Sequence, residues 1–165
     1  MIICGIMDPD PLTKKYLQAM RGITSTVSII SATNGSNKQA MTATSVTSLS
    51  LNPPSMLVCI NREALIHEVL VKDLLFCINI LSIDQEDIAE ICSIKGNEEL
   101  RFQDRNWLEE DGVPYNTNCK SNLFCRCIDS IAYETHTIFI GEVTKVNFNN
   151  EVDALLYKDG SYLGN

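Results

Sequence analysis

The stretch that decides the fold runs from residue 41 to residue 54 and reads Met41-Thr42-Ala43-Thr44-Ser45-Val46-Thr47-Ser48-Leu49-Ser50-Leu51-Asn52-Pro53-Pro54. Six of its first ten residues are serine or threonine. We interpret it as an extended segment that the two prolines end, because proline cannot donate to a β-ladder. Small hydroxylated residues let a ligand come close to the backbone and offer hydrogen bonds to a planar polar heterocycle. Taken alone, the pattern also fits an exposed, threonine-rich edge strand.

Outward from this stretch, hydrophobic periodicity and turn residues predict many strands and few helices. Residues 38–51 are expected to form a hairpin with residues 23–33 around the turn Asn34-Gly35-Ser36-Asn37. Further strands are expected at 56–61, 74–81, 123–133 and 137–148, with a strand pair in 154–162. Helices are expected at 10–21, 63–72 and 84–95, with Asp84 as the N-cap of the last, and an irregular excursion around Trp107 at 97–122.

These elements follow one another without a regular strand–helix–strand alternation, which favours an antiparallel barrel over a Rossmann sheet. The chain contains neither Gly-x-Gly-x-x-Gly nor a P-loop motif. It shows no internal repeat, linker or low-complexity tract. The predicted fold class is therefore mainly β, in a single domain spanning residues 1–165.

The composition of the chain limits which partners and which cellular compartment we expect. The net charge of −8 disfavours a nucleic-acid partner. The seven cysteines contain no Cys-x-x-Cys pair, so we interpret them as reduced structural thiols without a metal, typical of a reducing compartment. No apolar run approaches the roughly 20 residues of a transmembrane helix, and the segment Met1–Asp8 lacks the basic region of a secretory signal. We expect a cytoplasmic protein with no membrane partner.

From Leu17 to the C-terminus, the chain resembles the flavin reductase family, particularly the small reductase components of two-component flavin monooxygenases. Seven features carry the resemblance, in family order and at family-like spacing. They are Ala19-Met20-Arg21-Gly22-Ile23-Thr24; Val27-Ser28-Ile29-Ile30; Met41 to Ser50 with its Asn52-Pro53-Pro54 exit; Leu57-Val58-Cys59-Ile60-Asn61; Phe76-Cys77-Ile78-Asn79-Ile80-Leu81 leading into Asp84-Gln85; His136-Thr137-Ile138-Phe139-Ile140-Gly141-Glu142-Val143; and Leu155-Leu156-Tyr157.

The resemblance implies a six-stranded antiparallel split β-barrel with Greek-key connections and a few short peripheral helices. It implies a homodimer that binds FMN or FAD, takes hydride from NADH or NADPH, and has a flavin-dependent monooxygenase as its partner. The implied cofactor-binding residues are Thr42, Ala43, Thr44, Ser45, Val46, Thr47 and Ser48 around the flavin ring, Asn61, Arg62, Glu63, Ala64 and Ile66 near its phosphate, and His67, Phe102 and Tyr157.

His136 is the implied residue near the nicotinamide. Hydride transfer needs the nicotinamide C4 held about 3.5 Å from flavin N5, which is mainly a positioning problem. An imidazole could stack on the nicotinamide or hydrogen-bond to its carboxamide. From the residues alone, the sequence favours a surface histidine at His136 and a core or interface aromatic at Phe102, whereas Arg62 could equally be a solvated arginine.

Three positions depart from the family pattern. Ala40 replaces the usual glycine before the Met-Thr-Ala stretch, and the loop after Asn61 lacks the usual hydroxyls. Glu134-Thr135-His136 replaces the usual Gly-Asp-His. These changes leave open an alternative, an FMN-binding electron-transfer or storage flavoprotein without nicotinamide reductase activity. A barrel relative with another ligand is a third reading.

Overall fold

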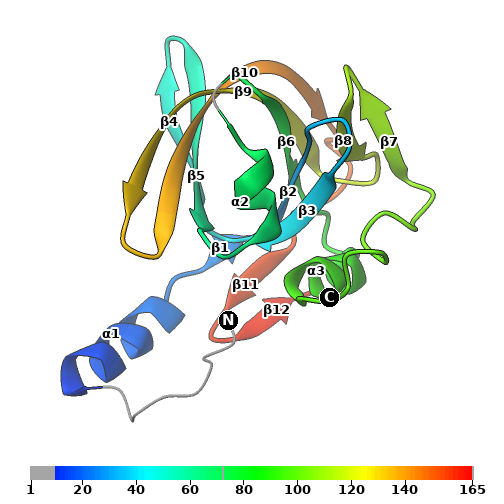
Figure 1. Ribbon diagram of the computed structural model, residues 1–165. Coiled ribbons are helices and arrows are strands. Elements are labelled where there is room, and N and C mark those ends of the chain that lie inside the picture. The colour runs from blue at the N-terminus through cyan, green and yellow to red at the C-terminus, as the bar shows by residue number, and fades with distance from the viewer. Residues whose placement is uncertain (1–9, 72, 165) are drawn as a thin grey trace.

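The computed structural model describes residues 10–71 and 73–164. Its body is a strongly curved antiparallel sheet of seven strands in the order β3-β2-β6-β9-β10-β5-β4 (Figure 1). The strands are β2 (Ser28–Thr33), β3 (Lys38–Ala43), β4 (Val46–Leu51), β5 (Pro54–Asn61), β6 (Leu75–Ile80), β9 (Ser121–Tyr133) and β10 (His136–Phe148). The hairpin predicted around residues 34–37 is confirmed as β2–β3.

The edge strands β3 and β4 are consecutive in the chain, although they lie at opposite ends of the sheet order. Only Thr44 and Ser45 separate them, and so short a link spans at most about 11 Å. The sheet must therefore curl until its edges approach, which is the geometry of a split barrel. The predicted split barrel is confirmed, with seven strands in place of six. The prediction of one extended segment at 38–51 is wrong, because the chain leaves the β2 ladder at Ala43 so that β4 can pair with β5.

The main core fills the concave side of this sheet. The predicted alternation along β10 is confirmed, since Thr137, Phe139 and Gly141 are buried. A Cβ atom at Gly141 would lie 2.6 Å from Phe76 Cζ and 2.9 Å from Cys125 Cβ. Only glycine therefore fits where β10 crosses the core.

Three helices accompany the sheet. Helix α1 (Pro11–Arg21) begins at the Asp10 carboxylate, which accepts hydrogen bonds from the main-chain N–H groups of Leu12 and Thr13, and it projects from the sheet (Figure 1). Helix α2 (Leu65–Val69) lies across the mouth of the barrel, and α3 (Glu86–Ser93) covers β2 and β3. None of the helices in the described ranges is both long and apolar enough to cross a membrane, and the prediction for Met1–Asp8 falls outside those ranges.

Two helix predictions need correction. Helix α2 is half the predicted length, because the backbone becomes extended at Leu70, whose side chain is buried in the main core. Asp84 is not the N-cap of α3. Its carboxylate accepts the Ser82 hydroxyl instead, while Gln85 Oε1 accepts the main-chain N–H of Ser82. These bonds form the turn that precedes α3.

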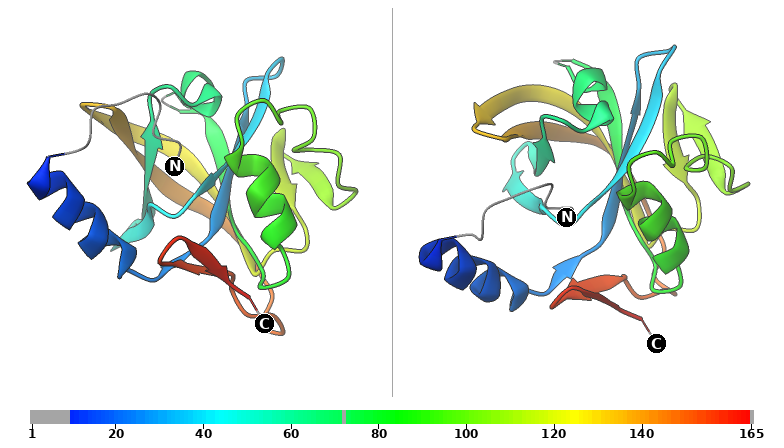
Figure 2. Two further views of the ribbon diagram at one scale, coloured as in Figure 1. Left: turned by 90° about the horizontal axis from the view of Figure 1, so that it is seen from below. Right: turned by 60° about the horizontal axis from the view of Figure 1, so that its bottom comes forward.

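Two smaller sheets complete the fold (Figure 2). Strands β1 (Ser25–Thr26), β11 (Leu156–Lys158) and β12 (Ser161–Leu163) form one, and β7 (Trp107–Glu110) and β8 (Val113–Asn116) form the other. The predicted strand at 23–33 is thus divided between β1 and β2 at the buried Val27. The excursion at 97–122 is not irregular throughout, because it contains the β7–β8 hairpin and the start of β9.

Candidate functional site

The hydroxyl-rich stretch is divided between exposed and packed side chains. Thr44, Ser45, Thr47 and Ser48 are exposed. Thr42 donates its hydroxyl to the carbonyl of Ala89 in α3 at 2.6 Å. The two apolar members, Ala43 and Val46, pack against the main core. Four of the seven residues predicted to line a flavin ring are therefore exposed, and they lie along the β3–β4 link and β4.

The β3–β4 link also contains two main-chain donors without a partner in the part of the chain that the structure describes. The carbonyl of Ser45 accepts the N–H of Cys59 in β5 at 3.0 Å. The main-chain N–H groups of Thr44 and Ser45, by contrast, donate to no other residue in the described ranges. Exposed donors on a strand of small residues can satisfy the acceptors of a planar ligand that lies against the backbone.

The loop between β5 and α2 is built around Asn61. The Asn61 side chain accepts the N–H of Glu63 at 2.9 Å, and its carbonyl accepts the N–H of Ala64 at 3.0 Å. Asn61, Arg62 and Glu63 are exposed and Ala64 is half-buried. Ile66, also predicted to approach the phosphate, is instead only 2% exposed and belongs to the main core.

Arg62 and His67 line a pocket of about 370 Å³ between α2 and the β9–β10 hairpin, together with Leu70, Val71, Ser130, Ala132, Thr137 and Phe139. His67 Nε2 lies 2.8 Å from the Thr137 hydroxyl, and the His67 ring meets the Phe139 ring edge-on at 5.5 Å. Sequence reasoning missed Thr137 and Phe139 as pocket residues. The sequence did place both side chains on one face of β10, and this is the face that α2 covers in the structure.

His136 begins β10 and is exposed on the face opposite Thr137. Its Nδ1 atom lies 2.9 Å from the Thr135 hydroxyl. In the sheet it pairs directly with Asn61 of β5, and Ser45 contacts β5 two residues before Asn61. The structure therefore brings the β3–β4 link, the Asn61 loop and His136 together at one end of β5 and β10.

Phe102 and Tyr157 lie elsewhere. Both pack against a second core cluster. The Phe102 ring meets that of Trp107 at 4.9 Å, and the Tyr157 ring meets that of Tyr162 at 5.3 Å. Within this one chain, neither residue lines the pocket beside Arg62 and His67.

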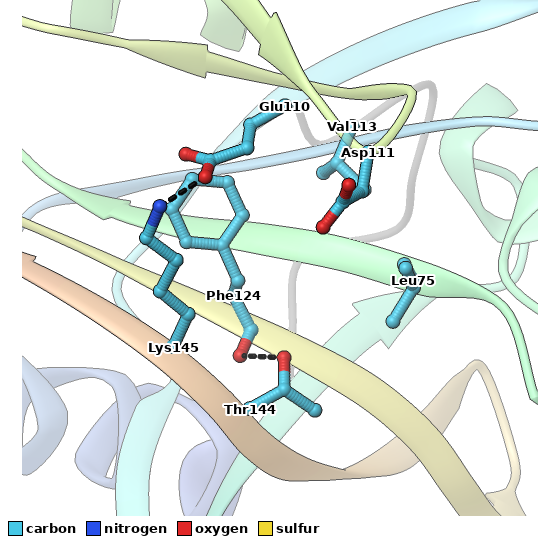
Figure 3. Close-up of a pocket in the computed structure, with 7 residues that line it drawn as sticks. All are labelled: Leu75, Glu110, Asp111, Val113, Phe124, Thr144 and Lys145. Carbon is cyan, nitrogen blue, oxygen red and sulfur yellow. Dashed lines mark hydrogen bonds and ion pairs between the residues drawn. The ribbon is translucent and has the colours of Figure 1, made fainter.

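A second cavity, of about 30 Å³, lies beside the β7–β8 hairpin (Figure 3). Lys145 and Glu110 form an ion pair at its rim, and Thr144 donates its hydroxyl to the Phe124 carbonyl at 3.1 Å. This volume holds about one water molecule, so the cavity is too small for an organic ligand.

The six described cysteines are free thiols. Burial raises the pKa of Cys92, Cys119 and Cys125 to about 12. These three thiols therefore stay protonated at neutral pH and behave as small core residues, as the sequence predicted. The described residues contain no group of three or more histidine, cysteine or acidic side chains placed to hold a metal ion.

A family model described as "Flavin reductase like domain" matches residues 20–164. The chain is 34% identical over 157 residues to the reductase component of an FADH2-dependent resorcinol hydroxylase from a Rhizobium species, covering 93% of this chain and 88% of the relative. It is 30% identical over 143 residues to an NADH-dependent FMN reductase of Pseudomonas syringae, covering 86% and 80%. The solved NADH:FAD oxidoreductase of Streptomyces globisporus, also determined in complex with NAD and FAD fragments, has a TM-score of 0.85 at 25% identity and covers 96% of both chains. This agreement in sequence and in fold shows that the chain belongs to the flavin reductase like domain family.

Proposed function

We propose that this protein is an NAD(P)H-dependent flavin reductase that transfers a hydride from the nicotinamide to FMN or FAD. It supplies the reduced flavin to a partner oxygenase or hydroxylase. The relatives support this activity, since they are named as NADH-dependent FMN or FAD reductases and as the reductase component of a hydroxylase. The structural observation that carries the proposal is the pair of N–H groups at Thr44 and Ser45, two exposed residues among small hydroxylated ones, which donate to no residue in the described ranges.

The residues at the β3–β4 link fit a flavin ring. An isoalloxazine is flat and carries several hydrogen-bond acceptors along one edge. It can therefore accept hydrogen bonds from main-chain N–H groups where the neighbouring side chains are small. Ser45, Thr47 and Ser48 add exposed hydroxyls along the same stretch, with Thr47 and Ser48 on opposite faces of β4. The Asn61 loop lies next to this surface and is the proposed place for the phosphate tail.

A bound flavin supplies the hydride acceptor, and the reduced nicotinamide supplies the hydride. The chain itself needs no strong acid or base for this reaction. Its contribution is positional: the β3–β4 link holds one ring, and His136, exposed at the start of β10, holds the other by stacking or by a hydrogen bond to the carboxamide. The neighbouring Thr135 hydroxyl fixes the orientation of the His136 imidazole.

The activity is tested with purified protein and all four combinations of FMN or FAD with NADH or NADPH. We expect the nicotinamide absorbance to fall faster than in a blank that contains flavin alone. No oxidation above that blank in any combination would contradict the proposal. Stoichiometric flavin binding without nicotinamide oxidation, together with reduction by dithionite, would favour the storage flavoprotein instead.

Replacing His136 with alanine is expected to lower kcat/KM for the nicotinamide about tenfold, because one orienting contact to the reacting ring is lost. Flavin affinity should stay within twofold, since the proposed flavin surface lies on the β3–β4 link. Steady-state kinetics and flavin fluorescence titration measure the two quantities. His136→Asn retains a hydrogen-bond donor and should recover part of the loss. An equal fall in flavin affinity would place His136 at the flavin instead.

We also propose that the working form is a homodimer of single-domain chains in the cytoplasm. Helix α1 has no buried residue, and three of its apolar side chains are exposed: 77% for Leu12, 58% for Tyr16 and 42% for Met20. On the sheet, Tyr133 and Leu51 are 74% and 91% exposed. A second copy would cover these apolar side chains.

One family match spanning residues 20–164 supports the single domain, and the free thiols support a reducing compartment.

A further inference from the structure

We propose that Arg62 is a positioning residue, which holds the β9–β10 turn so that His136 stays in place for the nicotinamide. This inference rests on the proposed function and deepens it. It assigns the Arg62 side chain to the turn that carries His136, in preference to the flavin phosphate.

Two contacts join Arg62 to the turn. Its main-chain N–H donates to the carbonyl of Thr135 at 2.9 Å, and its guanidinium Nη1 donates to the carbonyl of Glu134 at 3.4 Å. The Thr135 hydroxyl is hydrogen-bonded to the His136 imidazole. Arg62 therefore touches both residues that precede His136, and it does so from the loop that continues the paired strand β5.

Apart from the ladder in which His136 pairs with Tyr133 and with Asn61, the turn has little other support. Residues 129–136 are exposed throughout, and the 370 Å³ pocket lies beneath the end of the hairpin. Glu134 has a φ angle of +47°, a left-handed conformation that residues other than glycine adopt infrequently. A turn that lacks packing beneath it depends on the hydrogen bonds that hold it from the side.

The Arg62 guanidinium is not engaged in an ion pair with any described residue. A hydrogen bond from a charged donor to a carbonyl is stronger than one between neutral groups. On the other side of the pocket, the His67 bond to Thr137 holds the next residue of β10. Arg62 and His67 thus fix β10 on both sides of its first residue.

The test compares Arg62→Gln with Arg62→Lys and with Arg126→Gln. Arg126 is a matched control, because it is an exposed arginine on β9 whose Nη1 also donates to a main-chain carbonyl, that of Asp73, at 3.4 Å. We expect Arg62→Gln to raise KM for NADH about fivefold, because one charged hydrogen bond at an exposed site is lost, while the flavin Kd changes by less than twofold. Arg62→Lys keeps a charged donor and should restore part of the loss. Arg126→Gln should leave both constants unchanged.

A second readout uses the flavin-free protein and does not depend on activity. In NMR spectra, Arg62→Gln should shift and broaden the His136 imidazole resonances and speed amide exchange in residues 134–136, whereas Arg126→Gln should not. Unchanged His136 resonances, or a flavin Kd that rises while KM for NADH does not, would overturn the proposal and return Arg62 to the phosphate. If every variant and the native protein lack reductase activity, the proposed function fails, and the imidazole resonances still decide whether Arg62 holds His136.

Discussion

The Asn79→Leu variant is expected to lose about 3 kcal/mol of unfolding free energy. Asn79 is fully buried in β6. Its side-chain nitrogen donates to the carbonyl of Ile29 at 2.9 Å and to the hydroxyl of Ser31 at 2.8 Å. Its oxygen accepts the main-chain N–H of Asn116 at 3.0 Å and the side-chain nitrogen of Asn122 at 2.9 Å. One side chain thus joins β6 to β2, β8 and β9.

Leucine has the same number and branching of side-chain heavy atoms as asparagine, so the variant removes hydrogen bonds without opening a cavity. The N–H of Asn116 would then be buried without an acceptor, and a buried orphan of this kind costs about 1–3 kcal/mol. The Ile29 carbonyl and the Ser31 hydroxyl on β2 would also lose the Asn79 side-chain nitrogen as their donor. The main-chain anchor of the β7–β8 hairpin would be weakened together with the sheet.

Urea unfolding followed by Trp107 fluorescence and by circular dichroism measures the loss. Asn150→Leu is the matched control, because Asn150 is exposed, and its unfolding free energy should change by less than about 0.5 kcal/mol. We expect a lower midpoint with an unchanged slope in the Asn79 variant. An unfolding free energy within 0.5 kcal/mol of the native value would show that the network adds little to stability.

Local patterns predicted the elements whose structure is decided locally. The Asn34–Asn37 turn follows from its residue types, and the two faces of β10 follow from a period of two. The bend at Thr44–Ser45 has no such signal, because it results from the pairing of β4 with β5. The β7–β8 hairpin was hidden because its strands are short and its first strand carries acidic residues, although Asp111-Gly112 is a common turn pair.

Residues of the candidate site could be predicted from the sequence, but their positions relative to one another could not. The family resemblance selected Asn61 and His136 separately, at the end of one strand and near the start of another. Their direct pairing depends on the register between β5 and β10, which are separated by residues 62–135. The link from Arg62 to Glu134 and Thr135 follows from that same register. Register between distant strands is set by packing of the whole core, so no short motif contains it.

The Ser45→Trp variant is expected to weaken flavin binding at least about 100-fold, whereas Ser45→Ala should weaken it no more than about fivefold. The physical reason is close approach. The N–H groups of Thr44 and Ser45, which have no partner among the described residues, can bind a flat ring only if the ring lies against the backbone, and an indole at Ser45 would occupy that space. Alanine removes one hydroxyl and leaves the surface open.

The fold should tolerate both changes, because the Ser45 side chain is exposed and its contact with Cys59 is made by the main-chain carbonyl. Flavin fluorescence titration gives the affinity, and thermal unfolding confirms that each variant is folded. Ser161→Trp, an exposed serine in β12, controls for a surface tryptophan and should bind flavin like the native protein. If Ser45→Trp is folded and binds flavin with native affinity, the ring does not lie on the β3–β4 link. If alanine and tryptophan weaken binding equally, the Ser45 hydroxyl is the essential contact, and the backbone argument is wrong.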